Sequence, residues 1–277
     1  MNLVVQGPSL GRIDLEDFVA LARPAGMQRL GEHAARFSDA HRHDGIAGLC
    51  EHHRLDHAWM PEDRRFADLK LLAMDMDSTL ITIECIDEIG GMLGIKERIA
   101  AITAAAMRGE IDFPESLRRR VALLAGLDES ALTRVYDEKL RLSPGAEELV
   151  SACRKQGIRL LLVSGGFTFF TERLKTRLGL DDTISNVLEI SAGKLTGKML
   201  GRIVDAQAKA EKFREIASRL GAQPEQTVAI GDGANDLKMM AQAGISIAYH
   251  AKPVVRAQAS CALSYNGLDA VLNLFER

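Results

Sequence analysis

Apolar positions along this chain follow two periods, and the change of period predicts its elements. Leu71 to Met74 are four apolar residues without polar alternation, which is typical of a strand buried on both faces of a parallel sheet. Similar strand patterns follow at residues 159–163, 227–230 and 245–249. Amphipathic helical patterns occupy about residues 167–178, 206–220 and 268–275. Strands that alternate with helices predict an α/β fold with a doubly wound parallel sheet.

Two stretches depart from this alternation. Residues 187–190 and 195–200 flank Gly193-Lys194, which predicts a hairpin. Apolar residues recur at helical steps of three and four between the first two sheet strands, and this predicts a helical insert over residues 85–145. An insert at this place would lie over the carboxyl edge of the sheet, where it excludes water like a lid.

Residues 1–69 have a character of their own. Residues 3–5 predict a short strand, residues 15–22 a helix, and residues 45–57 a second helix. Together they predict a small α/β module in front of the larger fold.

Six of the seven histidines lie in this N-terminal part. His53 and His57 have the i, i+4 spacing with which a helix can hold a metal ion. No glutamate follows His53 to complete an HExxH motif. We favour solvated histidines on a polar surface over a metal site, and both interpretations stay open at this point.

Composition and charge narrow the class of protein. The 277 residues are 47% apolar, as in an ordinary globular protein with room for more than one module. There are 35 basic and 38 acidic residues, a formal net charge of -3, and no basic block of the kind that binds nucleic acid. We therefore expect a small-molecule partner and no nucleic acid.

Cysteine usage and hydropathy indicate where the protein works. Its four cysteines are scattered without paired spacing, which argues against a disulfide framework or a zinc site and fits a reducing cytoplasm. The N-terminus lacks the pattern of a signal peptide, and no apolar run approaches the roughly 20 residues of a membrane span. We expect no membrane partner. The oligomeric state stays open, with a homodimer among the options.

Polar residues gather where the predicted strands end. Asp75 and Asp77 follow the first strand, residues 164–166 (SGG) the second, and residues 231–236 (GDGAND) the strand over 227–230. The carboxyl ends of parallel strands meet at one edge of a sheet, so these loops should converge. Carboxylates suit Mg²⁺, and a hydroxyl beside backbone N–H groups at a helix start suits a phosphate. The combination predicts phosphoryl transfer through an aspartyl-phosphate.

Two cations occupy positions that are unusual for solvated side chains. Lys209 lies inside the apolar stripe of its predicted helix, where an ammonium needs an anionic partner. Its head could instead extend to solvent, but the phosphate-binding loops favour the inward orientation. Of three consecutive arginines, only Arg120 lies near the apolar stripe and should face inward. Arginine is the usual bidentate partner of a carboxylate, whereas Glu84 at the start of the insert could hold an ammonium.

These motifs resemble those of a known family. DMDST, SGG, the inward lysine and GDGAND, in this order around a helical insert, resemble the haloacid dehalogenase superfamily of phosphatases. Glu84, Met107 with Gly109 and Phe113, and SLRRRV with its Arg120 are similar to the branch that hydrolyses O-phospho-L-serine. The resemblance covers about residue 70 to the C-terminus.

The resemblance implies a division of the chain. Residues 70–84 and 146–277 would form the catalytic core, and residues 85–145 the helical cap. Residues 1–69 lie outside the match. Some relatives carry an ACT-like regulatory module there, and this segment vaguely resembles one.

The resemblance also implies catalytic roles. Asp75 would be the nucleophile that attacks phosphorus. Asp77 would be the general acid that protonates the seryl oxygen and then the base that activates water. Asp75, the backbone carbonyl of Asp77 and Asp232 would hold Mg²⁺, with Asp236 as support. The phosphoryl group would be bound by Ser164, Gly165 and Lys209, with Asn235 nearby.

The same resemblance implies how the substrate is recognised. Glu84 and Arg120 would take its ammonium and carboxylate, while Met107 and Phe113 would shield the site. The implied reaction is Mg²⁺-dependent hydrolysis of O-phospho-L-serine to L-serine and phosphate, the last step of serine biosynthesis. Two rivals stay open. One is a phosphotransferase of the same fold that uses another alcohol such as homoserine, and the other is a protein that senses an amino acid without turnover.

Overall fold

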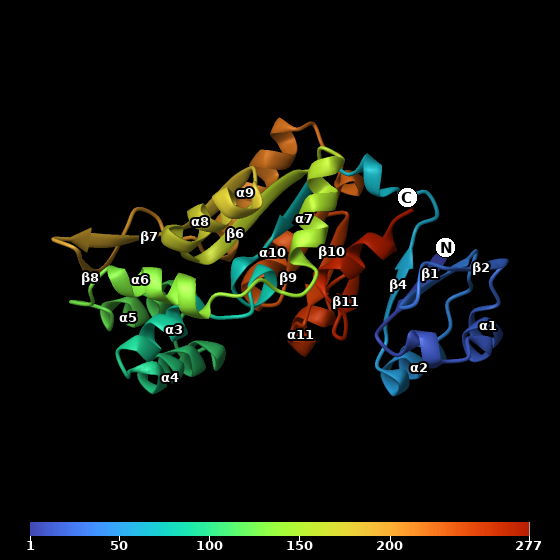
Figure 1. Ribbon diagram of the computed structural model, residues 1–277, viewed down its shortest axis with the longest axis horizontal. Coiled ribbons are helices and arrows are strands. Elements are labelled where there is room, and N and C mark those ends of the chain that lie inside the picture. Colours follow the sequence, from blue (N-terminus) through green and yellow to red (C-terminus); the bar gives the residue numbers. More distant parts are fainter. Residues whose placement is uncertain (277) are drawn as a thin grey trace.

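The computed structural model describes residues 1–276 and places them in two sheets with their helices (Figure 1). The larger sheet has the strand order β11-β10-β9-β5-β6-β7-β8. Neighbouring strands are parallel except β7 and β8, which form an antiparallel hairpin. The bounds are β5 Leu71–Met74, β6 Arg159–Phe167, β7 Asp182–Ser191, β8 Lys194–Leu200, β9 Thr227–Gly231, β10 Ile245–Tyr249 and β11 Cys261–Leu263. The four predicted strands and the predicted hairpin are confirmed.

Both faces of this sheet are covered by helices. Side chains alternate between the faces along a strand. Leu72 and Met74 belong to one apolar cluster, which includes side chains of α7 and α8, whereas Leu71 and Ala73 pack with α9, α10 and α11. The bounds are α7 Ala146–Lys155, α8 Thr168–Leu178, α9 Ala206–Arg219, α10 Leu237–Met240 and α11 Pro253–Arg256. The doubly wound architecture is therefore confirmed, and β5 needs an unbroken apolar run because both of its faces are buried.

Short helices fill the segment between β5 and β6. The chain leaves the core through a π-helical turn, η3 (Met76–Leu80). It returns to the core next to this exit, where Ile81 and Leu142 form an antiparallel β-bridge. The helices are α3 Cys85–Met92, α4 Lys96–Met107, α5 Phe113–Ala122, α6 Ser130–Arg134 and η4 Val135–Lys139. We call this group of helices the cap. Helix α5 packs against α4 and against β8 of the core, so the cap rests on the hairpin (Figure 1).

The first 60 residues form a second, antiparallel sheet with the strand order β2-β3-β1-β4. Its elements are β1 Asn2–Gln6, α1 Glu16–Ala22, β2 Gly26–Arg29, β3 Ala34–Ser38, α2 Gly45–His53 and β4 Asp56–Met60. This part contacts the far end of the larger sheet. There the Asp56 carboxylate accepts hydrogen bonds from the backbone N atoms of Ser264 and Tyr265, at 2.7 and 3.1 Å.

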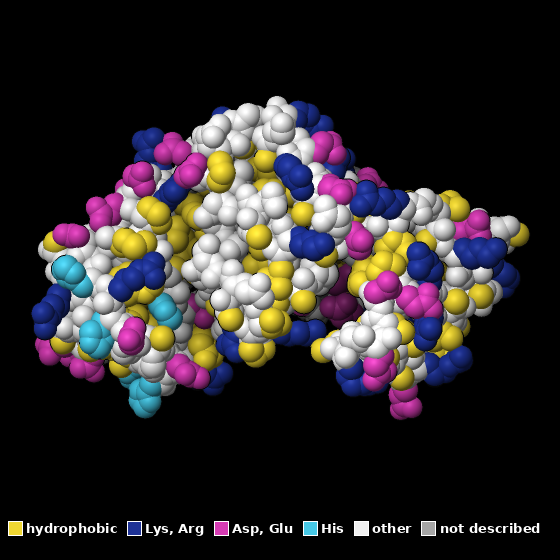
Figure 2. Space-filling view, turned by 180° about the vertical axis from the view of Figure 1, so that it is seen from behind, with side chains coloured by type: hydrophobic (Ala, Val, Ile, Leu, Met, Phe, Trp, Pro, Cys, Tyr) yellow, Lys and Arg dark blue, Asp and Glu magenta, His cyan; other side chains and the backbone are white. Residues whose placement is uncertain are grey.

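The helix predicted over residues 45–57 is too long. It ends at His53 because Arg54 adopts a left-handed conformation with φ 55°, and β4 begins at Asp56. His53 and His57 therefore do not share a helix, which removes the spacing argument for a metal site. Figure 2 shows histidine side chains spread over the surface of this part.

Other boundaries also differ from the prediction. Phe167 belongs to β6 rather than to the following helix, and Leu268–Leu274 is a 3₁₀-helix, η7, rather than an α-helix. The short strands β2, β3 and β11 were not predicted, because three to five residues give too few periods to distinguish a strand from a loop. Within residues 1–276, the helices are too short or too polar to cross a membrane.

Candidate active site

The three predicted loops meet at the carboxyl edge of the larger sheet, beneath the cap. They line a pocket of about 670 Å³ that also takes side chains from α3, α4 and α5. Figure 2 shows a recess between the core and the cap with acidic side chains at its bottom. Charged groups from both parts therefore face one pocket, where partial burial strengthens their interactions.

Asp75 lies at the bottom of this pocket, directly after β5. The residue is 5% exposed, and its Oδ1 accepts hydrogen bonds from the backbone N of Met76 at 2.7 Å and from Lys209 Nζ at 2.9 Å. Burial raises the pKa of Asp75 well above its ordinary value, and the charge of Asp236 adds to this, while Lys209 opposes it. One carboxylate oxygen is thus held in place at the position predicted for a nucleophile.

Lys209 points inward from α9, as predicted. Its side chain is fully buried, and Nζ lies 2.8 Å from Asp236 Oδ1 as well as 2.9 Å from Asp75. Burial alone would lower the pKa of Lys209, but the two carboxylates outweigh burial and raise it. The alternative in which its head extends to solvent is wrong. Lys209 remains charged and connects the loop after β5 with the loop after β9.

Asp77 lies two residues further along and points toward the cap side of the pocket. Its Oδ1 accepts a hydrogen bond from the backbone N of Cys85 at 3.0 Å. Burial and the nearby charge of Glu84 raise the pKa of Asp77 to about 7. A carboxyl with this pKa exists in both protonation states at neutral pH, which suits a group that first donates and then accepts a proton.

The loop after β6 supplies neutral hydrogen-bonding groups. Ser164 is fully buried, and its Oγ accepts a hydrogen bond from the backbone N of Gly166 at 2.8 Å, which leaves the hydroxyl proton available for a phosphate oxygen. Asn186 fixes the loop by donating to the carbonyl of Gly165 at 2.8 Å. A Cβ at Gly166 would lie 2.7 Å from Asp77 Oδ2, so only glycine allows this close approach.

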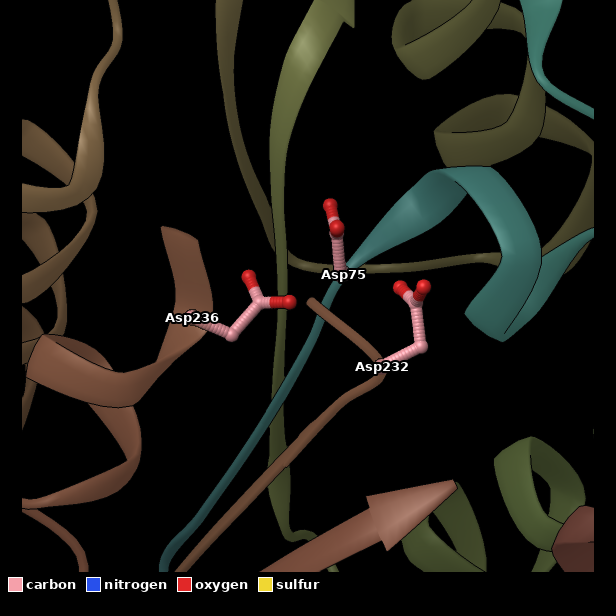
Figure 3. Close-up of side chains that lie close together, drawn as sticks. All are labelled: Asp75, Asp232 and Asp236. Atoms are coloured by element: carbon pink, nitrogen blue, oxygen red, sulfur yellow. The ribbon is translucent and has the colours of Figure 1, made fainter. Parts of the chain in front are cut away.

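Three carboxylates lie close enough to hold one metal ion. The ligand atoms of Asp75, Asp232 and Asp236 lie within 4.8 Å of one another and come from the loops after β5 and β9 (Figure 3). Burial, followed by the charges of Asp236 and Glu84, raises the pKa of Asp232 to about 7. A divalent cation would relieve this concentration of negative charge, and oxygen ligands suit a hard cation. The cluster thus fits a hard divalent cation.

The cap brings two further charged groups to the pocket. Arg120 lines it, whereas Arg118 and Arg119 are exposed, as the helical pattern predicted. Burial lowers the pKa of Arg120, although Asp87 and Glu84 oppose this effect. Glu84 also lines the pocket, and its Oε1 accepts a hydrogen bond from Ser78 Oγ at 2.8 Å.

The remaining predicted residues also reach the pocket wall. Asn235, Met107 and Phe113 line it together with Gly165. Met107 is 66% exposed, so it bounds the mouth rather than the interior. A Cβ at Gly165 would come within 3.0 Å of the Phe113 ring, and the ring therefore lies directly over the SGG loop.

Sequence reasoning missed several residues of the pocket wall, among them Ser116, Asp87 and Lys252. Ser116 and Asp87 lie on cap helices, and Lys252 follows β10, with Nζ 4.0 Å from Met107 Sδ across the mouth. Ser116 could have been found, because it precedes Arg120 by one helical turn and shares its face. No motif in the sequence marks Lys252.

Comparison with known proteins agrees with this geometry. A family model of haloacid dehalogenase-like hydrolases matches residues 72–241. The chain is 55% identical over 217 residues to a phosphoserine phosphatase of Polaromonas sp., an alignment that covers 76% of this chain and 92% of that protein. The chain belongs to the haloacid dehalogenase-like hydrolase family.

Two solved structures place the similarity within that family. A probable phosphoserine phosphatase from Vibrio cholerae has a TM-score of 0.85 at 39% identity and covers 99% of this chain and 85% of its own. A phospho-aspartyl intermediate analogue of phosphoserine phosphatase has a TM-score of 0.70 at 38% identity and covers 75% of this chain and 99% of its own. Both of these structures, like the Polaromonas relative, are of phosphoserine phosphatases or a probable one.

Proposed function

We propose that this protein is a phosphoserine phosphatase, which hydrolyses O-phospho-L-serine to L-serine and phosphate in the last step of serine biosynthesis. One observation carries the proposal. The same pocket holds the Asp75 and Asp77 pair on the core side and the Glu84 and Arg120 pair on the cap side. The first pair suits phosphoryl transfer, and the second matches the opposite charges of an amino acid.

The first half of the reaction forms a covalent intermediate. An oxygen of the Asp75 carboxylate attacks phosphorus, the bond from phosphorus to the seryl oxygen breaks, and Asp77 gives its proton to that oxygen. Met76 N and Lys209 Nζ hold Asp75 Oδ1, so the carboxylate is oriented before the substrate arrives. Lys209, the Ser164 hydroxyl and the Gly165 backbone bind the phosphoryl oxygens, with Asn235 beside them.

The second half regenerates the enzyme. Asp77, now ionised, takes a proton from water, and that water attacks phosphorus so that the bond to Asp75 breaks and phosphate leaves. The pKa of about 7 at Asp77 supports both transfers. A retained proton relay of this kind contributes about 10² to 10⁴-fold to the rate.

A Mg²⁺ ion is part of the proposal. Asp75, the backbone carbonyl of Asp77 and Asp232 would hold it, and Asp236 would support the cluster while it pairs with Lys209. The ion would supply positive charge to the phosphoryl group and the attacking carboxylate.

The cap would select the substrate. Glu84 would take the ammonium and Arg120 the carboxylate, since each has the opposite charge and no ion pair of its own within residues 1–276. Met107 and Phe113 would shield the reacting groups from water. We extend the proposal to a catalytic core over residues 70–84 and 146–277 and a helical cap over residues 85–145.

The remaining proposals concern the whole protein. Residues 1–69 would form an ACT-like regulatory module, supported by their antiparallel sheet with two connecting helices.

All four cysteines are buried and unpaired, which supports a cytoplasmic location. A homodimer is the assembly to test, by light scattering.

Phosphate release from O-phospho-L-serine tests the function. We expect rapid release with Mg²⁺ and loss of release with excess EDTA, restored by adding Mg²⁺. Homoserine in the same reaction should form no phosphate ester, which separates hydrolysis from the phosphotransferase alternative. Binding of phosphoserine without phosphate release would contradict the proposal and favour a sensor.

A further inference from the structure

Ser116 stands out among the residues that line the pocket. It lies on α5, one turn before Arg120, and is only 1% exposed. Within residues 1–276, its Oγ makes no hydrogen bond. A buried hydroxyl without a partner destabilises a fold, so it calls for a specific explanation.

Local structure does not supply that explanation. A serine inside a helix commonly donates its hydroxyl to the carbonyl four residues earlier. Here the Asp112 carbonyl accepts the backbone N of Ser116 at 2.9 Å, but the hydroxyl makes no hydrogen bond to it. Alanine would suit this buried helical position better, because it has higher helix propensity and no polar atom to satisfy.

The position of Arg120 indicates what the hydroxyl is for. Arg120 Nε lies 3.4 Å from the Ser116 carbonyl, so the arginine side chain folds back along the helix over the turn that carries Ser116. Both residues line the same pocket, so an anion held by this guanidinium would lie near the turn that carries Ser116. A carboxylate offers about four lone pairs, of which a bidentate arginine uses two.

We propose that Ser116 is a specificity-determining residue whose Oγ donates a hydrogen bond to the substrate carboxylate held by Arg120. This inference rests on the proposed function, because it assigns a contact within the same amino-acid site. The hydroxyl turns about χ1 between staggered positions, and the bound carboxylate gives it the acceptor that the protein itself does not provide.

Ser116→Ala tests the contact with two substrates. We expect kcat/KM for O-phospho-L-serine to fall about tenfold, mainly through KM, because a hydrogen bond to a charged group is lost. Phosphoethanolamine lacks the carboxylate, so its kcat/KM should stay within about twofold. The free energy of unfolding in denaturant, measured without substrate, should be unchanged or higher, because an unsatisfied hydroxyl has been removed.

Ser246→Ala is the matched control. Ser246 is also buried, but its Oγ lies 3.2 Å from Ser260 Oγ and accepts the Ser260 backbone N at 2.9 Å. This control should lower stability and leave the ratio of the two substrates unchanged. Equal losses for both substrates in Ser116→Ala, no loss for phosphoserine, or a stability loss like that of the control would each overturn the inference. If the unaltered protein hydrolyses no phosphoserine, the proposed function fails first and this inference fails with it.

Discussion

The core side and the cap side of the pocket, which we call its bottom and its roof, differ in how the protein pairs their charges. At the bottom, Lys209 is fully buried and contacts both Asp75 and Asp236 within 2.9 Å. In the roof, the one hydrogen bond of the Arg120 side chain within residues 1–276 goes to a backbone carbonyl at 3.4 Å, and that of the Glu84 carboxylate comes from the Ser78 hydroxyl. The buried cation at the bottom is thus paired within the protein, whereas the roof presents charges that a ligand can satisfy.

This difference suggests a division of labour. Groups at the bottom are fixed in place by one another, which suits chemistry common to every phosphate ester. Groups in the roof keep unpaired charge for the rest of the substrate, which suits recognition. Substitutions at the bottom should therefore affect all substrates alike, and those in the roof should affect only substrates with the matching charge.

Asp75→Asn should have the largest effect. The amide is no nucleophile toward phosphorus, so turnover should fall at least about 10³-fold for phosphoserine and phosphoethanolamine alike. Circular dichroism should show an intact fold. Asp137→Asn, which changes an exposed aspartate in the cap, serves as the control and should retain activity. Activity retained in Asp75→Asn would remove Asp75 as the nucleophile.

Lys209→Met should damage both stability and catalysis. It leaves the buried carboxylates of Asp75 and Asp236 without their cation, and the loss of one partner of a buried pair costs about 3–5 kcal/mol. Urea denaturation in EDTA would measure this loss. Lys212→Met removes a partly exposed lysine of the same helix, which pairs with Glu215, and should cost less than about 1 kcal/mol. Similar losses in the two variants would contradict the buried network.

Arg120→Ala should weaken recognition of the substrate by the roof and leave catalysis at the bottom intact. We expect kcat/KM for phosphoserine to fall about 100-fold, because a charge-assisted bidentate pair is lost, and kcat/KM for phosphoethanolamine to change little. The neighbouring Arg119 is exposed and pairs with Glu115, so Arg119→Ala should leave both values unchanged. Equal losses for the two substrates in Arg120→Ala would exclude the carboxylate contact.

Glu84 should give the smallest and most pH-dependent effect. The carboxylate borders the pocket, and the protein around it raises its pKa above the ordinary value. Only the ionised form can hold an ammonium. Preference for phosphoserine over 3-phospholactate, which has a hydroxyl in place of the ammonium, should therefore decrease as pH falls through the raised pKa, by up to about tenfold per pH unit below it. Glu84→Gln should give a low preference at every pH, and a preference that follows pH in this variant would count against the role.

Much of this site could be predicted because its signals are local. Asp75 follows a four-residue apolar strand, and the positions of Lys209 and Arg120 on their helices follow from a period of 3.6 residues. Parallel strands end at one edge, so the convergence of the three loops also follows from the order of the elements.

The rest depends on contacts between distant residues. Asp236 partners Lys209 from 27 residues away, and Lys252 reaches Met107 across 145 residues. Neither contact leaves a periodic trace in the sequence. The end of α2 at Arg54 was missed for another reason: a left-handed arginine is rare, and glycine is the usual signal for such an ending.

The substrate selectivity of the unaltered protein tests most directly whether the bottom of the pocket performs catalysis while the roof selects the substrate. We would measure kcat/KM with Mg²⁺ for O-phospho-L-serine, phosphoethanolamine, 3-phospholactate and glycerol 3-phosphate. If the roof recognises the charges of the amino acid, kcat/KM for phosphoserine should exceed that for each other ester by at least about tenfold. The value for glycerol 3-phosphate should be lowest, because this ester lacks both charges. Similar values for all four esters would show that the bottom of the pocket works without selection by the roof, and would contradict the account.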